Sequence, residues 1–192
     1  MKTKWMAALL ALILALPPAA LAENAWTGFR SVEWGAFEED IVEQEQRVAD
    51  YSRAFTDLCL DLVYEGVTVS RFSNAQAAYI LYDGVLVGAG YAIATSDEED
   101  EIYLREALTE RYGRPNADGR LIFRTIYGLL SPENENSSIL ETAPTAWTVE
   151  GTGILLCPDE DRLVVLYVGL DYLNGMDEDA EEEPETVVTD GL

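Results

Sequence analysis

The chain has 192 residues, of which 36 are acidic and 12 basic, so its formal net charge at pH 7 is −24. A charge of this size repels nucleic acid and anionic lipid surfaces, and neither is expected as a partner. The sequence has no histidine, which excludes serine–histidine and cysteine–histidine nucleophile systems and histidine-bound zinc.

The first 22 residues have the three parts of a secretory signal peptide. Lys2 and Lys4 precede an apolar run over residues 5–16, and an A-x-A cleavage site ends at Ala22. The apolar run is shorter than the roughly 17–25 residues that cross a bilayer. We therefore expect residues 1–22 to be removed. The remaining protein, outside the cytoplasm, has 10 basic and 36 acidic residues, a charge of −26, and no membrane span.

Residues 23–173 are predicted to form one α+β domain that begins with an amphipathic helix over residues 37–49. Apolar side chains recur there near helical spacing, and acidic residues crowd the first turn, where the helix dipole favours negative charge. The acidic residues of this helix are interpreted as a solvated face.

Strand-forming segments follow this helix: residues 60–69, 77–82 and 85–93. Asp83-Gly84 joins the last two and is typical of a type I′ hairpin turn, in which both central residues have positive φ. Gly88 and Gly90 lie inside the third segment. They predict a bulge, or a place where another backbone or an aromatic ring comes close.

A second helix is predicted over residues 97–112, with Ser96 or Asp97 as its cap and Gly113 and Pro115 after its end. Its acidic start lacks the ligand spacing and central glycine of a calcium loop. Residues 121–130 could form a helix or a strand, and the spacing of their apolar residues favours a helix. Three more strands are then expected: residues 147–151, 154–157 and 162–168.

The element order repeats a helix followed by three strands, in units of about 28–95 and 97–173. We expect two tandem helix-plus-antiparallel-three-strand units that form one sheet, with helices on one face and the other face exposed. Residues 174–192 are acidic with few apolar side chains, so they are predicted to be a disordered tail.

The segments FRSVEWG (29–35), AYILYDGVLV (78–87) and RYGRP (111–115) resemble small secreted bacterial proteins of unassigned function. The organisation is similar to the superfamily that contains the β-lactamase inhibitory protein and the small outer-membrane assembly lipoproteins. This resemblance implies a non-catalytic module that holds a protein partner on a sheet face. The chain lacks the lipidated cysteine of those lipoproteins, which argues against their role in membrane assembly.

Cys59 and Cys157 are the only cysteines, and both lie in apolar, strand-like runs. An oxidising compartment favours a disulfide between them, and the alternative is two buried thiols that act as small hydrophobic side chains. Their spacing lacks the C-x-x-C pattern of structural zinc sites and of thiol exchange.

Aromatic residues and a few acids are the remaining candidates for a site. Tyr79, Tyr82, Tyr91 and Trp147 could form an exposed binding surface, although core packing explains most aromatic side chains in strands. Acids that could point inward from apolar strands are the candidates for a paired-carboxylate hydrolase: Asp61, Glu65 and Glu150. Strand edges or loops are the other interpretation of these acids.

We therefore expect an exported, non-catalytic binding module without cofactor or metal. Its protein partner would bind at the exposed sheet face. The acidity is interpreted first as a source of solubility, and the alternative is a cationic partner or weak cation binding. The alternative is a secreted hydrolase that uses paired carboxylates on envelope or carbohydrate material. A third class is a structural or cation-buffering acidic protein.

Overall fold

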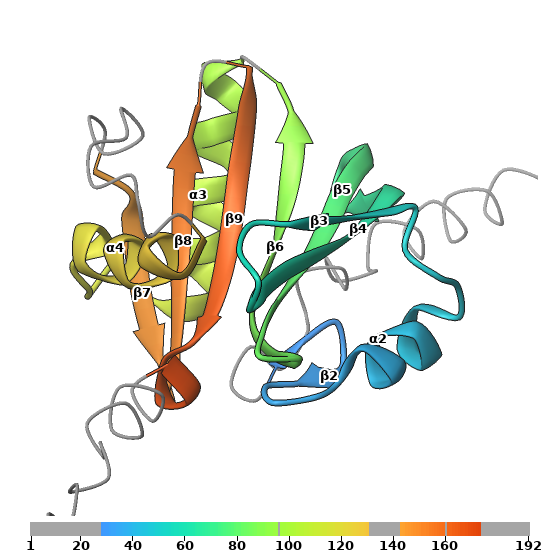
Figure 1. Cartoon of the computed structure of the whole chain (residues 1–192). Helices are drawn as coiled ribbons and strands as arrows, with labels where there is room; N and C mark the ends of the chain where they lie inside the picture. The colour runs from blue at the N-terminus through green and yellow to red at the C-terminus, as the bar shows by residue number, and fades with distance from the viewer. Residues whose placement is uncertain (1–27, 96, 131–142, 160, 174–192) are drawn as a thin grey trace, which may run out of the picture.

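A computed structural model describes residues 28–95, 97–130, 143–159 and 161–173 of the chain. The predicted signal peptide (1–22) and acidic tail (174–192) lie outside these residues. Within them the protein is α+β, as predicted, with helices packed on an antiparallel sheet (Figure 1). The helices are α2 (Glu38–Glu45), α3 (Glu98–Tyr112) and α4 (Gly119–Leu130).

One seven-stranded sheet forms the centre of the molecule, and all its neighbouring strands are antiparallel. From one edge to the other, its strands are β3 (Tyr51–Ala54), β4 (Cys59–Val69), β5 (Phe72–Tyr82), β6 (Val85–Ala94), β9 (Arg162–Gly169), β8 (Thr152–Pro158) and β7 (Thr145–Val149). A separate short hairpin pairs β1 (Gly28–Phe29) with β2 (Val32–Glu33). The two predicted groups of three strands therefore meet where β6 pairs with β9.

The turn at Asp83-Gly84 confirms the predicted hairpin, because φ is 49° at Asp83 and 80° at Gly84. A register shift follows in β6, where Ile80 of β5 pairs with Gly88 and Leu81 pairs with Leu86. The bulge predicted from the glycines is therefore present beside Gly88. At Gly90, an added Cβ would lie 2.5 Å from the carbonyl oxygen of Val165, so the neighbouring strand also comes close, as predicted.

The outcome differs for two of the predicted helices. Residues 119–130 are helical, as their apolar spacing indicated. The first helix ends at Glu45 and not at residue 49, because Gln46 adopts a left-handed conformation with φ of 55° and its N–H bonds to the carbonyl of Glu43. The chain then enters β3, a strand that the sequence analysis did not predict.

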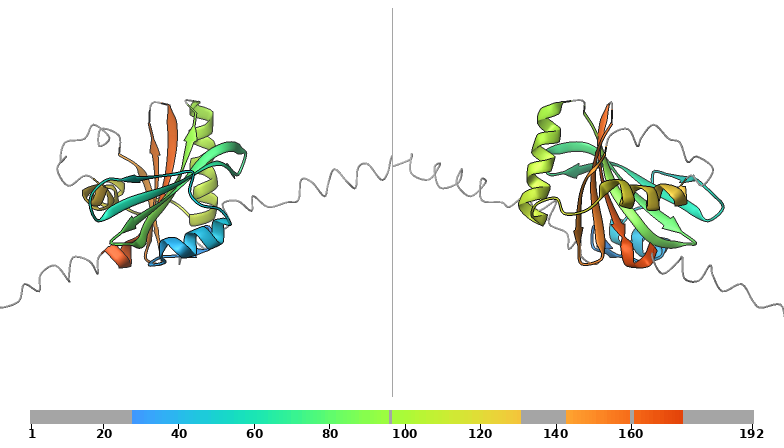
Figure 2. Two further views of the ribbon diagram at one scale, coloured as in Figure 1. Left: turned by 45° about the vertical axis from the view of Figure 1, so that its right-hand side comes forward. Right: turned by 90° about the vertical axis from the view of Figure 1, so that its left-hand side faces the viewer.

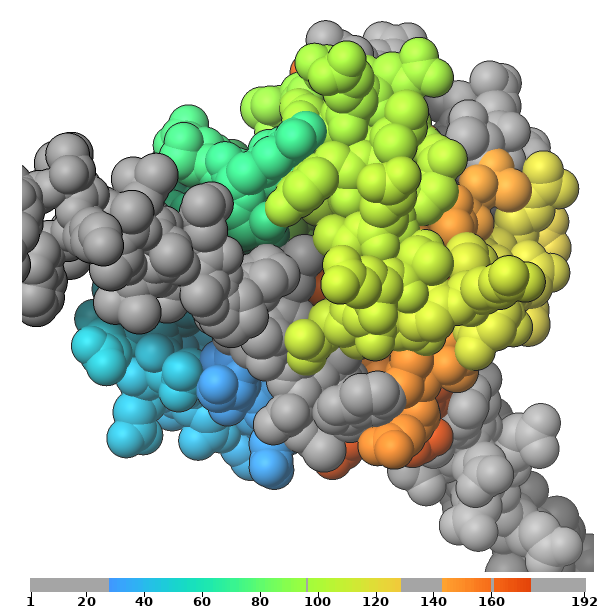
Figure 3. Space-filling view, turned by 180° about the vertical axis from the view of Figure 1, so that it is seen from behind, coloured from blue at the N-terminus to red at the C-terminus, as the bar shows by residue number. Residues whose placement is uncertain are grey.

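Helices cover both faces of the sheet, which corrects the expectation that they all lie on one face. Ile41 of α2 and Leu104 of α3 belong to one buried cluster, whereas Ile122 and Ile126 of α4 belong to the cluster on the opposite face. In the right-hand view of Figure 2, the sheet stands between α3 and α4. Figure 3 shows the face that carries α2, in cyan, and α3, in yellow-green.

Two glycines of the sheet explain how α4 packs so closely on the second face. An added Cβ would lie 3.2 Å from Cδ1 of Ile126 at Gly88, and 3.0 Å from Cγ2 of Ile122 at Gly153. The missing side chains leave room for the apolar side of α4. The expected exposed sheet face is therefore occupied by α4 at the end that carries β7 and β8.

Candidate binding surface

The aromatic residues predicted to form a binding surface are mostly buried. Tyr79, Tyr91 and Trp147 belong to the cluster under α2 and α3, and Tyr79 and Trp147 have no exposed surface. The prediction is wrong for these three, because strand alternation points them towards the face that α2 and α3 cover. Tyr82 points to the opposite face and is half-buried against the cluster that contains α4.

A buried polar group within the aromatic cluster fixes α2 and the first hairpin to the sheet. Arg30 donates to Glu45 through Nε (2.6 Å to Oε1) and Nη2 (3.2 Å to Oε2), and the Tyr79 hydroxyl also donates to Oε1. Burial alone would lower the pKa of Arg30, but its hydrogen bonds to Glu45 and Tyr91 outweigh burial and raise it. These contacts link the β1–β2 hairpin, α2 and β5 to one another. We therefore interpret this polar group as structural.

The two cysteines are free and do not form the expected disulfide. Cys59 lies on β4 and Cys157 on β8, four strand spacings apart in the sheet. At about 4.8 Å per spacing they are about 19 Å apart, far beyond the roughly 7 Å that a disulfide can join. Burial raises the pKa of Cys59 to about 11, with a contribution from Asp61, and raises that of Cys157 to about 12. Both thiols are therefore poor nucleophiles at neutral pH.

The three candidate acids do not converge on one site. Asp61 is buried on β4, as a catalytic or structural carboxylate would be. Glu65 is exposed at the far part of the same strand, and Glu150 is exposed in the tight turn between β7 and β8. Across the part of the chain that the structure describes, no three acidic or cysteine side chains are arranged to hold a metal ion.

Trp34 helps to line two open hollows. One, of about 260 Å³, is lined by Trp34 and Tyr172 and by the acids Glu33, Glu150 and Asp171. The other, of about 500 Å³, lies between the residues that follow β1 and the start of α2. The smaller hollow thus combines carboxylates with aromatic side chains, although its acids are exposed.

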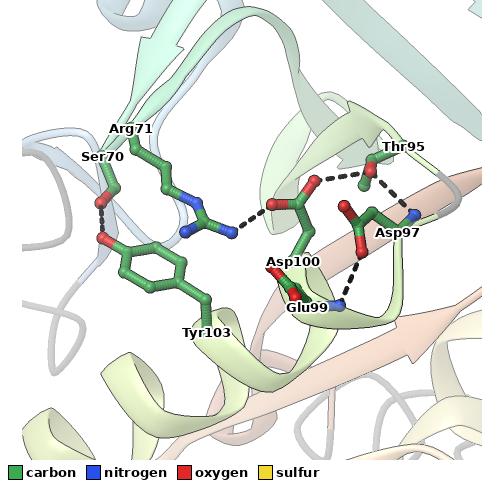
Figure 4. Close-up of polar contacts among 7 residues, drawn as sticks. All are labelled: Ser70, Arg71, Thr95, Asp97, Glu99, Asp100 and Tyr103. Carbon is green, nitrogen blue, oxygen red and sulfur yellow. Dashed lines mark hydrogen bonds and ion pairs between the residues drawn. The ribbon is translucent and has the colours of Figure 1, made fainter.

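A polar cluster at the start of α3 is shown in Figure 4. Asp100 accepts a hydrogen bond from Thr95 (2.6 Å) and pairs with Arg71, and these contacts lower its pKa. The Arg71 guanidinium lies 4.0 Å from the centre of the Tyr103 ring, and the Tyr103 hydroxyl is hydrogen-bonded to Ser70. The cluster attaches α3 to the turn between β4 and β5, which is a structural role.

The two edges of the sheet differ in whether their outward backbone groups are hydrogen-bonded. At the β7 edge, Asn116 donates its backbone N–H to Ala146 O (3.1 Å) and its side-chain amide to Thr148 O (3.2 Å). The Asn116 side chain also accepts from the backbone N–H of Thr148 (2.8 Å). Asn116, in the segment that leads into α4, thus bonds the carbonyl of Ala146 and both backbone groups of Thr148 at that edge. The β3 edge has one neighbour, β4, within the described sheet.

All four residues of β3 are exposed, and Phe55 follows them. Two contacts hold the side chain of Arg53 in this strand. Its Nη2 lies 2.6 Å from Oδ2 of the buried Asp61, and its guanidinium carbon lies 5.0 Å from the centre of the Phe55 ring. Tyr51 is 41% exposed and Phe55 38%. We call the side chains of Tyr51, Arg53 and Phe55, together with the neighbouring Leu58, the β3 surface.

Exposed apolar side chains are concentrated in the part of the sequence that contains this strand. Among the described residues, eight large apolar side chains are exposed, and five of them lie between residues 37 and 58: Phe37, Val48, Tyr51, Phe55 and Leu58. The sequence analysis missed this surface. Large side chains at 51, 53 and 55 alternate with small ones at 52 and 54, and this two-residue period was the available signal.

No family model matches the sequence, and neither the curated proteins nor the solved structures give a significant match. The described helices are all too short or too polar to cross a membrane. Geometry and sequence are therefore the basis for the functional proposal.

Proposed function

We propose that this protein is an exported, non-catalytic binding module that engages a protein partner through the β3 surface. The observation that carries the proposal is the contrast between the two edges of the sheet. Asn116 bonds backbone groups of Ala146 and Thr148 at the β7 edge, whereas β3 has every residue exposed and aromatic side chains on one face. Exposed aromatic residues and arginine are the side chains that protein interfaces use most for binding energy.

The fixed position of Arg53 supports this proposal. A long exposed arginine normally loses rotamer freedom when a partner binds, and that loss weakens binding. Here the buried Asp61 and the Phe55 ring already hold the guanidinium. The β3 surface is thus organised before a partner arrives.

Export and tandem organisation belong to the same proposal. The charged, apolar and small-residue segments of residues 1–22 support export. Each half of the domain has a helix before a group of antiparallel strands, β4-β5-β6 and β7-β8-β9, which supports two related units. N-terminal sequencing of the secreted product tests export: a start at Glu23 is expected, and a start at Met1 would contradict it.

Site-specific photocrosslinking in the producing cells tests the binding surface. A photoreactive phenylalanine analogue replaces Tyr51 or Phe55, and the matched control carries it at Ile102 of α3, which is 43% exposed. We expect the same protein adduct from positions 51 and 55 and none from position 102. Equal adducts at all three positions, or none at 51 and 55, would overturn the proposal.

A carboxylate hydrolase is the second candidate, and the hollow beside Trp34 is the observation that favours it. Glu33, Glu150 and Asp171 line that hollow with two aromatic residues, and glycoside hydrolysis needs two acids about 5–10 Å apart. The test is hydrolysis of cell-wall and polysaccharide substrates by the wild type and by Glu33→Gln and Asp171→Asn. If the wild type hydrolyses a substrate and both substitutions abolish this activity, the result would favour the hydrolase over the binding module.

A further inference from the structure

The outward side of β3 has backbone groups that no contact within the described chain uses. Phe55 donates its N–H to Cys59 O at 2.8 Å, which places the pair Phe55–Cys59 at a hydrogen-bonded position of the ladder. Such positions recur every second residue in antiparallel strands. Arg53 and Tyr51 therefore face β4 with their backbone groups, and those of Ser52 and Ala54 point away from the sheet.

These outward N–H and C=O groups determine which kind of partner can bind at the β3 edge. The N–H and C=O of Ser52 and Ala54 form two donor–acceptor pairs, about 7 Å apart along the strand because alternate residues are about 3.4 Å × 2 apart. An extended backbone presents complementary groups at the same spacing, and β-strand addition to a sheet edge uses this match. The β3 edge also lacks proline and lysine, two common means of blocking such pairing.

Charge decides between a second copy of the chain and a different partner. Residues 37–70 contain nine acids and two arginines, and both arginines are already paired, Arg47 with Asp50 and Arg53 with Asp61. Two copies would bring together surfaces of the same sign, each on a chain of charge −24. A basic segment would instead be attracted to this region.

We infer that β3 accepts an extended segment of its protein partner, rich in lysine or arginine, as an additional strand of the sheet. This inference rests on the proposed function and specifies its binding mode. Alternate side chains of the added strand would lie beside Tyr51 and Phe55, and its basic side chains would lie near unpaired acids such as Asp57. With four backbone hydrogen bonds available, the association is expected to be reversible.

Amide hydrogen exchange measured by NMR on the full chain tests the mode directly. The probe is an amidated ten-residue peptide of alternating lysine and valine, and the controls replace lysine by glutamate or one central valine by proline. We expect saturating probe to slow exchange at Ser52 and Ala54 at least tenfold, and neither control to do so. The amide of Thr148, already bonded to Asn116, should be unchanged. Unchanged exchange at Ser52 and Ala54, or equal slowing by the glutamate peptide, would overturn the inference.

Variants of the edge give a second, independent measurement. Ala54→Pro removes an outward N–H and leaves the bonds to β4 in place, because proline is tolerated where the N–H faces solvent. Ser52→Ala keeps its backbone N–H and is the matched control. We expect at least a tenfold weaker peptide affinity for Ala54→Pro and less than a twofold change for Ser52→Ala, with the β6 amide spectrum confirming the fold. Equal affinities would overturn strand addition.

The same variants separate this inference from the proposed function. If photocrosslinks at positions 51 and 55 persist in Ala54→Pro, the partner binds the β3 surface without strand addition, and only the binding mode fails. If no crosslink forms in the wild type, the proposed function fails. The exchange measurement with the peptide still decides whether β3 can receive a strand.

Discussion

The guanidinium of Arg53 lies on an exposed edge strand, yet its closest partner is the carboxylate of Asp61, which is almost fully buried: Nη2 and Oδ2 are 2.6 Å apart, and the side chains are 59% and 3% exposed. An ionised carboxylate in such a position needs a hydrogen-bonded partner. The pair therefore joins the stability of the sheet to the conformation of its exposed edge.

Removing Arg53 alone should cost more stability than removing both partners of this ion pair. Arg53→Ala leaves the buried carboxylate of Asp61 without its partner, and we expect the free energy of unfolding to fall by about 1–3 kcal/mol. The double variant Arg53→Met/Asp61→Leu should lose less than Arg53→Ala, because no buried charge remains. Urea unfolding followed by tryptophan fluorescence measures both. A double variant less stable than the single one would contradict this account.

The cysteines should be reduced and slow to react in the folded protein. Because burial raises both pKa values, to about 11 for Cys59 and about 12 for Cys157, we expect little labelling by iodoacetamide at pH 8. Two equivalents should be incorporated once the protein is unfolded, without reductant. Mass spectrometry counts the labels, and an unfolded protein that takes up none would indicate a disulfide.

Two glycines of β6 offer a matched pair of substitutions. Gly90→Ala would place Cβ 2.5 Å from the backbone oxygen of Val165, whereas Gly88→Ala would place it 3.2 Å from the movable end of Ile126. We expect Gly90→Ala to lower the free energy of unfolding by about 1–3 kcal/mol, as overpacking does, and Gly88→Ala by less than about 1 kcal/mol. Chemical unfolding of both variants gives the comparison, and equal losses would count against the close approach of β6 and β9.

Stability should fall at alkaline pH. The pKa values of Cys59, Cys157, Tyr64 and Tyr167 are raised, chiefly by burial. A raised pKa means that the folded state holds its proton more tightly, so stability is constant below the unfolded-state pKa and decreases as pH rises above it. We expect a stable plateau to about pH 8 and a decline above about pH 9, where unfolded thiols ionise.

Denaturant midpoints at pH 7, 9 and 10.5 measure this decline. Cys157→Ala is the control, because it removes one of the groups and should make the decline less steep. A midpoint that rises between pH 9 and 10.5 would contradict the assigned burial of these groups.

Much of the fold could be predicted because its signals are local. The Asp83-Gly84 turn needs only positive φ at two positions, and the start of α3 needs only the cap that Asp97 supplies to the N–H of Glu99. The end of α2 could not be predicted in this way. Gln46 takes a left-handed conformation there, although glycine is the residue that favours it.

The candidate site was less predictable because it depends on contacts distant in sequence. Strand alternation shows that Tyr79 and Tyr82 face opposite sides of the sheet, but it does not show that α2 and α3 cover the side of Tyr79. The distance between Cys59 and Cys157 depends on the order of the strands in the sheet. The residues that flank each cysteine in the sequence do not reveal that order. β3 is short and exposed on all its residues, so it has no buried face to produce a clear hydrophobic pattern.

The Asn116 contacts at β7 have a further consequence for assembly. Strand addition from copy to copy propagates into a fibre only when each molecule offers two open edges, one to give and one to receive. Because Asn116 already bonds Ala146 O and both backbone groups of Thr148, β7 is a poor second edge, and we expect pairing at β3 to end after a single step. If a partner adds a strand at β3, we therefore expect a stoichiometry of one added strand per molecule, which a high concentration of the protein does not extend into a polymer.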